Sequence, residues 1–299
     1  MKNFFATTIV SHDAGAAEIL SSYVKNTKGN YIFVLSGPAK KIFKKKIKNI
    51  IISKLDKAEM ISFKLICGTS FKSKIELEAI DKFKKKKKET IAIIDHWINY
   101  KQRFFKNRKL ILPNKIWVFD KHAKKLIKKI FPKVKIYLKK NFYFSDIKKN
   151  IKNKIKNKNK SKILYVSEPI NNLKEIKMNN FKDSREYKTV KYFFDNIKHI
   201  TKKNYDIIFR HHPNEAYKKY KWLSDVIINV RFSKQKSLIK DIQNSDIVIG
   251  RQTMAMVVGL ILKKKVISCI PPDEKRCMLP FKKIKELRDI VKKNRCIAV

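Results

Sequence analysis

Two stretches in the second half of the chain carry the residue types best suited to chemistry. The first, 205–215, reads YDIIFRHHPNE and presents Arg210, His211 and His212 directly before Pro213. Its three apolar residues are too few for a helix, and proline ends a strand. The pattern therefore predicts a strand that delivers cationic and hydrogen-bonding side chains at its carboxyl end, where they could bind a phosphate.

The second stretch, 246–259, reads DIVIGRQTMAMVVG and predicts a strand, a turn and a helix. Arg251 and Gln252 lie in the turn, and Thr253 begins the helix. A helix N-terminus offers free backbone N–H groups and a positive potential, so this turn is a candidate anion site. The alternative is that Thr253 is only a helix cap and that the histidines merely end a strand.

Strand-like and helix-like segments alternate along the whole chain, which predicts parallel α/β sheets. We expect strands at 4–10, 31–35, 63–67, 90–94 and, as the last of the first series, 115–119. A second series is expected at 163–166, 207–209, 226–230, 247–249 and 266–270, with helices near 187–200, 238–243 and 254–262 and a helical segment over 281–293. The predicted fold class is two Rossmann-like doubly wound domains, 1–145 and 163–299, joined by a Lys/Asn-rich linker over 146–162.

Ligands of open parallel sheets bind outside the carboxyl ends of the strands, so residues that follow other strands join the candidate site. Ser167 and Glu168 follow the strand predicted at 163–166, and Pro271 follows the one at 266–270. Together with Glu215 they complete a predicted nucleotide-binding set.

Charge and cysteine content restrict the class of protein. The formal net charge is +48, yet only 9 of the 73 basic residues are Arg. Proteins that recognise bases or bind phosphates through paired hydrogen bonds favour Arg, so nucleic acid is an unfavoured partner. Anionic lipid surfaces remain a candidate partner. The four cysteines never form a CxxC, which favours a reducing cytoplasm. We expect no signal peptide and no membrane span, so any contact with the inner membrane face would be peripheral.

The order of His212-Pro213 and then a strand–turn–helix bearing Thr253 resembles the second domain of GT-B glycosyltransferases. It is most similar to the HP and Ser/Thr motifs of bacterial sialyltransferases and polysialyltransferases, and to comparable segments of CDP-glycerol glycerophosphotransferases. The resemblance covers residues 160–280 by motif and the whole chain by architecture. It implies two domains facing a cleft, with the histidine and the hydroxyl group holding the donor phosphate. Gln252-Thr253 stands where a pair of hydroxyl residues is usual.

The first predicted domain offers a catalytic base and an acceptor loop. Sugar transfer with inversion needs a base near the acceptor hydroxyl, and Asp13, with His12 second, follows the first strand. The loop after the strand at 90–94 is dense in polar and aromatic residues, which suits acceptor binding by Asp95, His96, Trp97, Asn99, Tyr100 and Arg103. The alternative for this loop is an aromatic plug in which Asp95 pairs with Arg103.

These features predict a metal-independent glycosyltransferase with no cofactor. Its substrates would be a nucleotide-sugar donor and a glycan or lipid-linked acceptor of surface polysaccharide synthesis. There is no DxD, HExxH or Cys/His cluster, so no metal site is expected. Two alternatives remain open, a nucleotide-sugar epimerase or hydrolase of the same fold and a basic nucleic-acid-binding protein without catalysis.

Overall fold

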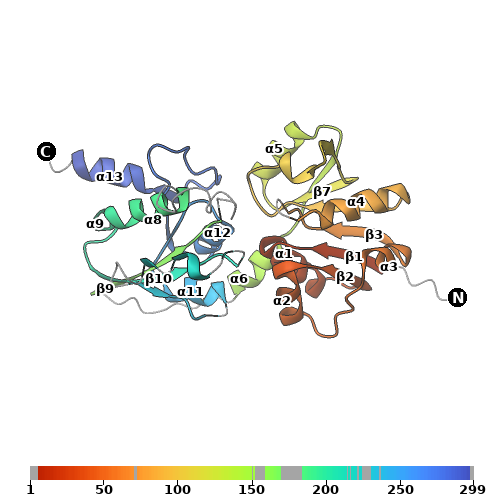
Figure 1. Ribbon diagram of the computed structural model, residues 1–299, viewed down its shortest axis with the longest axis horizontal. Helices are drawn as coiled ribbons and strands as arrows, with labels where there is room; N and C mark the ends of the chain where they lie inside the picture. The colour runs from red at the N-terminus through yellow and green to blue at the C-terminus, as the bar shows by residue number, and fades with distance from the viewer. Residues whose placement is uncertain are drawn as a thin grey trace. The chain divides into compact units, whose positions relative to one another are not determined.

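The computed structural model divides the chain into two compact units, Met1–Asp146 and Ile147–Val299 (Figure 1). The structure describes residues 6–70, 73–149, 151, 159–169, 184–213, 215, 217–220, 222–223, 230–235 and 237–296. Each unit is built on a parallel sheet flanked by helices, so the predicted α/β class with two doubly wound units is confirmed.

The sheet of the first unit has the strand order β2-β1-β3-β4-β7-β8. Its strands are β1 (Ala6–Ser11), β2 (Tyr31–Leu35), β3 (Ser62–Cys67), β4 (Glu89–Ile93), β7 (Lys115–Val118) and β8 (Lys135–Leu138). The helices are α1 (Ala14–Asn26), α2 (Gly37–Lys46), α3 (Leu55–Met60), α4 (Ile75–Lys85), α5 (Lys121–Ile130) and α6 (Phe142–Lys149). A 3-10 turn, Gln102–Phe104, precedes the short hairpin of β5 (Phe105–Lys106) and β6 (Lys109–Leu110).

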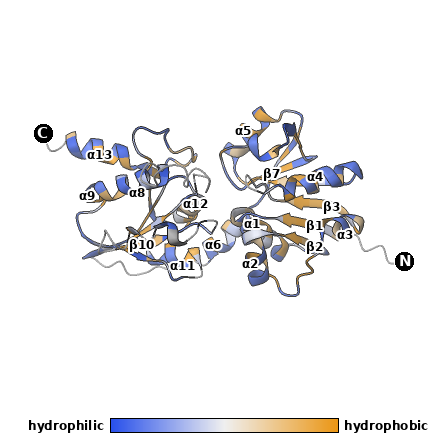
Figure 2. Ribbon diagram, in the orientation of Figure 1, coloured by the Kyte–Doolittle hydropathy of each residue, from blue (hydrophilic) through white to orange (hydrophobic). Residues whose placement is uncertain are grey.

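The central strands are rich in buried apolar residues because helices cover both faces of the sheet. Ile9, Leu65 and Ile116 are fully buried, and Figure 2 shows the strands as the most hydrophobic part of this unit. Right-handed crossovers put α1, which leads from β1 to β2, on one face. The same rule puts α4 and α5, which lead in the opposite direction along the sheet, on the other face.

The first series was expected to end with the strand at 115–119, and this prediction is wrong. β8 pairs with β7 in parallel and forms the edge of the sheet. Its sequence KIYL is followed directly by Lys139 and Lys140, and Tyr137 and Leu138 are 39% and 43% exposed. A partly exposed edge strand lacks the continuous apolar run that marks the buried strands, so the sequence pattern did not indicate β8.

The sheet of the second unit has the strand order β11-β10-β9-β12-β13-β14. Its strands are β9 (Lys160–Val166), β10 (Asn204–Arg210), β11 (Val230–Phe232), β12 (Ile247–Gly250), β13 (Lys265–Ser268) and β14 (Ile284–Glu286). The helices are α8 (Arg185–Asp195), α9 (Ile197–Ile200), α11 (Leu238–Asn244), α12 (Met254–Ile261) and α13 (Leu287–Cys296), with a 3-10 turn at Tyr217–Tyr220.

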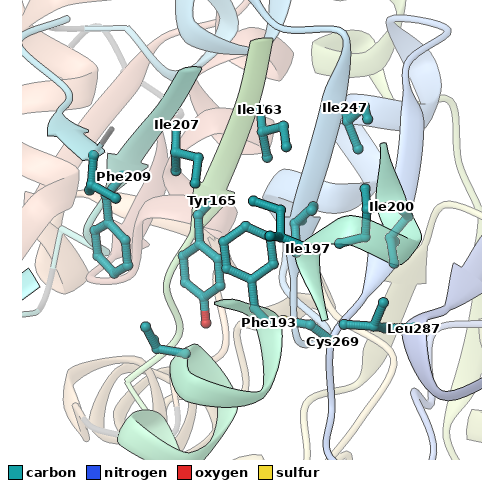
Figure 3. Close-up of a cluster of buried hydrophobic side chains, with 14 of the residues drawn as sticks. Ile163, Tyr165, Phe193, Ile197, Ile200, Ile207, Phe209, Ile247, Cys269 and Leu287 are labelled. Carbon is teal, nitrogen blue, oxygen red and sulfur yellow. The ribbon is translucent and has the colours of Figure 1, made fainter. Parts of the chain in front are cut away.

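An aromatic core lies under the strand ends that carry the candidate residues of the second unit. The rings of Tyr165 and Phe209 stack with centroids 4.8 Å apart, and Tyr220 packs on Phe209 at 4.6 Å. Figure 3 shows these neighbouring strands with Phe193 and Leu287 contributed by helices on the same side. Fully buried side chains of this size anchor the ends of β9 and β10 firmly.

The helix expected over 281–293 is partly wrong, because residues 284–286 form β14 and α13 begins at Leu287. Pairing with β13 overrides the local helical preference of this lysine-rich segment. The strand expected at 226–230 is described from Val230 onward, as β11, and its other residues lie outside the described ranges. Of the expected linker, 152–158 also lies outside them, while α6 reaches Lys149 and β9 begins at Lys160. No described helix is long and apolar enough to cross a membrane.

Candidate functional site

The end of the central strand β9 connects the two stretches that the sequence singles out. The backbone N–H of His212 donates to the Ser167 hydroxyl at 2.8 Å. The next residue, Glu168, accepts from the backbone N–H of Gln252 at 3.3 Å. The loop that begins with His212 and Pro213 is called the HP loop, and the turn that contains Arg251 and Gln252 is called the β12–α12 turn. Because β9 lies between β10 and β12, adjacent residues at its carboxyl end hold the HP loop on one side and the β12–α12 turn on the other. The two predicted motifs therefore share one edge of this sheet.

The carboxylate of Glu215 fixes the HP loop through hydrogen bonds. One of its carboxylate oxygens accepts from the Ser167 hydroxyl and from the His212 N–H, and the other accepts from Lys219 and Tyr220 at 2.9 and 2.7 Å. Burial acts to raise the pKa of Glu215, but hydrogen bonds from Ser167 and the Lys219 ammonium outweigh it, so the pKa is lowered. The predicted nucleotide-binding pair Ser167 and Glu215 thus positions the loop with these contacts.

The hydroxyl of Thr253 is the strongest ligand-binding candidate in the β12–α12 turn. Thr253 occupies the N-cap position of α12, yet its side chain makes no capping hydrogen bond. The residue is 7% exposed, and its buried Oγ1 has no hydrogen-bond partner among the described residues. A buried hydroxyl normally finds a partner, and the first N–H groups of a helix attract anions. This geometry suits a phosphate oxygen.

The two predicted phosphate-binding arginines are each paired with a carboxylate. Arg210 donates to Asp241, whose side chain is 1% exposed. Arg251 forms a bidentate ion pair with Glu274, with N–O distances of 2.9 and 2.7 Å, and it also donates to the Thr189 hydroxyl. In this structure both guanidinium groups hold neighbouring loops in place, whereas the Thr253 hydroxyl has no hydrogen-bond partner among the described residues.

The loop after β13 is held close to the same turn. The guanidinium of Arg288 on α13 donates to the backbone oxygens of Ile270 and Pro271 at 3.2 and 2.6 Å. Gln252 accepts from the backbone N–H of Met278 at 3.1 Å through its side-chain oxygen. Pro271, predicted to contact the nucleotide, therefore belongs to a loop whose path is fixed by several hydrogen bonds.

His12 and Asp13 follow β1 in the first unit, as predicted. The imidazole Nδ1 of His12 lies 2.8 Å from the Ser36 hydroxyl, and its Nε2 lies 3.9 Å from Asp13 Oδ1. Gly37, at φ +50°, lies so close to the ring that a β-carbon there would be 2.6 Å from it. Asp13 Oδ1 is buried with no hydrogen-bond partner among the described residues. A packed imidazole beside an unmatched carboxylate oxygen is a suitable arrangement for accepting a proton.

Two buried carboxyl groups lie beneath this loop. Glu76 of α4 is 1% exposed and accepts from the His12 N–H at 2.9 Å. Burial, with the charges of Asp13 and Asp95 adding to it, raises the pKa of Glu76 to about 8. Asp95 accepts from the backbone N–H of Ala16 in the first turn of α1. It also pairs with Arg103 at 3.4 Å.

Gly15 makes the contact between α1 and Asp95 possible, because a β-carbon at this position would overlap the Asp95 carboxylate. We expect Gly15→Ala to lower the free energy of unfolding by about 2 kcal/mol, the usual cost of forcing an extra carbon into a packed site. Urea denaturation measures it. The same substitution in an Asp95→Ala background should cost less, and an equal cost in both backgrounds would contradict the contact.

Most of the predicted acceptor loop is packed rather than open. Arg103 donates to the Thr69 backbone oxygen at 2.7 Å. The indole of Trp97 donates to Asp120 at 2.7 Å. Tyr100 is also buried, and burial raises the pKa of its phenol. These contacts support the aromatic-plug alternative for most of the loop and leave His96 half-buried and Asn99 exposed at its surface.

Several residues that shape the site carry no signal in the sequence. In the sequence, Glu76 has the pattern of a residue that caps its helix, and Lys219, Asp241 and Glu274 have that of solvent-facing charges. Their roles come from contacts with residues 31 positions away for Asp241 and 64 positions away for Glu76. Within the described residues, no group of three or more His, Cys, Asp or Glu side chains could hold a metal ion.

No protein-family model matches this chain, and no curated protein matches it at a significant level. Several solved structures do match the fold of this chain. The UDP-N-acetylglucosamine 2-epimerase of Rickettsia bellii matches with a TM-score of 0.60 at 14% identity, covering 89% of this chain and 79% of that one. The UDP-GlcNAc 2-epimerase of Methanocaldococcus jannaschii matches with a TM-score of 0.57 at 14% identity, covering 88% and 83%.

A variant of the wall teichoic acid polymerase TagF also matches, with a TM-score of 0.50 at 12% identity, covering 90% of this chain and 70% of that one. The chain has the GT-B type of fold. At these identities the comparisons establish the fold alone, and the chemistry has to be argued from the residues.

Proposed function

We propose that this chain is a metal-independent GT-B glycosyltransferase that moves a sugar from a nucleotide donor to a surface-polysaccharide or lipid-linked acceptor. The observation that carries the proposal is the joining of the HP loop and the β12–α12 turn by Ser167 and Glu168. The motif resemblance to bacterial sialyltransferases and CDP-glycerol glycerophosphotransferases supports the same role for these two segments.

The donor phosphate would bind at the N-terminus of α12. Thr253 Oγ1 and the first N–H groups of the helix would contact its oxygens, and His212 would donate to the departing phosphate. Glu168 lies beside this position, and burial raises the pKa of its carboxyl group, an effect that Arg251 opposes. A carboxyl group that ionises less readily repels an incoming phosphate less.

Asp13 would accept the proton of the acceptor hydroxyl, with His12 orienting it or acting in its place. His96 and Asn99, the accessible residues of the loop after β4, are the candidate acceptor contacts. We expect a nucleotide-sugar as substrate and no further cofactor, and a peripheral location at the inner membrane face.

A second function, epimerisation or hydrolysis of a nucleotide-sugar, is favoured by one observation, the similarity of the whole chain to two structures of UDP-N-acetylglucosamine 2-epimerases. The two functions differ in their need for an acceptor. Transfer predicts that free nucleotide appears only when an acceptor glycan is supplied. An altered or released sugar in reactions without an acceptor would favour the second function.

Nucleotide binding tests the donor site directly. We expect at least one of CMP, CDP, UDP, GDP and ADP to raise the melting temperature, and Thr253→Ala to weaken its binding roughly tenfold, the effect of losing one hydrogen bond to a charged group. Because the Thr253 side chain caps no backbone group, the substitution should leave the melting temperature of the free protein almost unchanged. Thermal shift and calorimetric titration measure both effects.

Ser237→Ala is the matched control, since Ser237 occupies the N-cap of α11 and its side chain makes no capping hydrogen bond either. It should bind nucleotide like the unchanged protein. No stabilisation by any of the five nucleotides would overturn the donor site. Salt-sensitive binding of DNA or RNA that survives both Thr253→Ala and His212→Ala would instead favour the nucleic-acid-binding alternative.

A further inference from the structure

A cavity of about 330 Å³ lies within the first unit, apart from His12 and Asp13. Its lining side chains come from α1, from strands β3, β4 and β7, and from the segment that follows β8. Ile19 and Leu20 of α1 and Ile93 of β4 provide an aliphatic surface. Since α1 covers one face of the sheet and α4 and α5 cover the other, the cavity lies on the α1 face.

Aromatic rings form a second part of the wall. The rings of Tyr23 and Trp117 meet edge to face with centroids 5.4 Å apart, and Phe142 lies 6.3 Å from Tyr23. Phe119 also contributes to the lining. In the adjoining edge strand β8, Tyr137 pairs in register with Trp117, so its side chain lies on the cavity face of the sheet, where it is 39% exposed. Apolar surface therefore continues from the cavity toward the solvent.

Three lysines, Lys64, Lys139 and Lys140, line the same cavity. The ammonium of Lys139 lies 5.3 Å from the Trp117 ring centre, and that of Lys140 lies 5.4 Å from the Phe142 ring centre. Among the described residues, none of the three lysines forms an ion pair with a carboxylate. Three unneutralised cations around an apolar cavity are complementary to an anion with an apolar body.

The lining also indicates what kind of anion fits. Its ten side chains include no carboxylate, amide or imidazole group. A nucleobase would bring N–H donors for which these side chains offer no carboxylate, amide or imidazole acceptor, and leaving such donors unmatched is costly. An acyl chain needs only apolar contact, and a phosphate headgroup needs only the cations. The cavity therefore favours an amphiphile over a nucleotide.

We infer that this cavity, with the exposed side chain of Tyr137, is a docking site for an acidic phospholipid at a membrane surface. The lysines would contact the phosphate, while the aliphatic and aromatic walls would receive the first part of an acyl chain. Peripheral membrane proteins commonly bind a bilayer surface through such a combination of cations and inserted apolar side chains. The inference does not depend on the donor site, because every residue it uses lies in the first unit.

Binding of the full chain to lipid vesicles tests this site. We expect binding to mixed phosphatidylglycerol–phosphatidylcholine vesicles and little to phosphatidylcholine alone. Replacing Lys139 and Lys140 by Glu should weaken binding at least about tenfold, since each lysine near an anionic surface contributes appreciably to affinity. The matched control replaces Lys124 and Lys125, exposed on α5 across the sheet, and makes the same change in net charge. It should weaken binding by less than about threefold.

Quenching of Trp117 locates the lipid. Phosphatidylglycerol with brominated acyl chains should quench the fluorescence of the unchanged protein. Trp117→Phe, measured at a vesicle concentration that binds it fully, should lose most of this quenching. Equal weakening by the two lysine pairs, or no loss of quenching in Trp117→Phe, would overturn the site. A dimer that only the Lys139/Lys140 change dissociates, or nucleotide binding that the same change abolishes, would show a different occupant and also overturn it.

Discussion

Replacing Glu215 by alanine is expected to lower the free energy of unfolding by about 3 to 5 kcal/mol and to weaken nucleotide binding. The Glu215 side chain is 2% exposed, and its carboxylate accepts from the Ser167 hydroxyl, the His212 N–H, Lys219 and Tyr220. Alanine would leave these donors buried with fewer partners, and a buried donor without an acceptor costs more than the hydrogen bond itself contributed.

The second effect follows from the position of His212. Its backbone N–H donates to both Ser167 and Glu215, so the loop that carries the imidazole loses one of its two acceptors together with the carboxylate. Ser167, which itself donates to Glu215, would then hold the HP loop alone. Nucleotide affinity should fall even at temperatures where the variant remains folded.

Chemical denaturation and calorimetric titration measure the two effects of Glu215→Ala. Asp206→Ala is the matched control, because Asp206 lies on β10 in a solvent-accessible pair with Lys160 and should cost less than about 1 kcal/mol. Glu215→Gln keeps the shape and one acceptor oxygen, so its cost should fall between the two. A cost below that of Asp206→Ala would contradict the central role of Glu215.

The strand ends could be predicted from the sequence because the pattern that marks them is local. An apolar run followed at once by Arg, His and Pro places those residues at a carboxyl edge whatever the order of the strands. The same reasoning located Ser167, Glu168, Thr253 and the His12-Asp13 loop. The edge strands β8 and β14 were missed because they are short and partly exposed, so periodicity and burial leave little trace in their sequences.

The partners of the predicted residues could not be found in this way. Arg210 and Arg251 have the residue type that grips phosphates, but strand order brings Asp241 and Glu274 against them from 31 and 23 residues away. A sequence indicates that a buried arginine pairs with an anion, but it does not show whether that anion is a carboxylate of the protein or the phosphate of a ligand. Thr253 illustrates the converse, because its hydroxyl is distinguished by lacking a hydrogen-bond partner among the described residues, which only the packed structure reveals.

Raising the pH from 5 to 8 is expected to destabilise the protein through Glu76 by about 3 to 4 kcal/mol, at up to about 1.4 kcal/mol for each pH unit. Burial raises the pKa of this carboxyl group from the ordinary value of 4.5 to about 8. Between these two values the folded chain retains a proton that the unfolded chain has released. The stabilising contribution is therefore complete below the unfolded pKa, and it is lost as the pH rises toward the folded pKa.

Glu76→Gln removes the ionisable group while keeping an oxygen that can accept from the His12 N–H, so its stability should not fall over this pH range through position 76. At pH 8 the variant should be more stable than the unchanged protein, and at pH 5 the two should be similar. Glu78→Gln, on the exposed face of the same helix, is the control and should keep the full pH dependence. The difference in free energy of unfolding between Glu76→Gln and the unchanged protein, measured by urea denaturation at each pH, isolates the group. Parallel pH profiles for all three proteins would show that Glu76 is ionised in the folded state, and the loop that carries His12 and Asp13 would then rest on a buried negative charge rather than on a neutral acid.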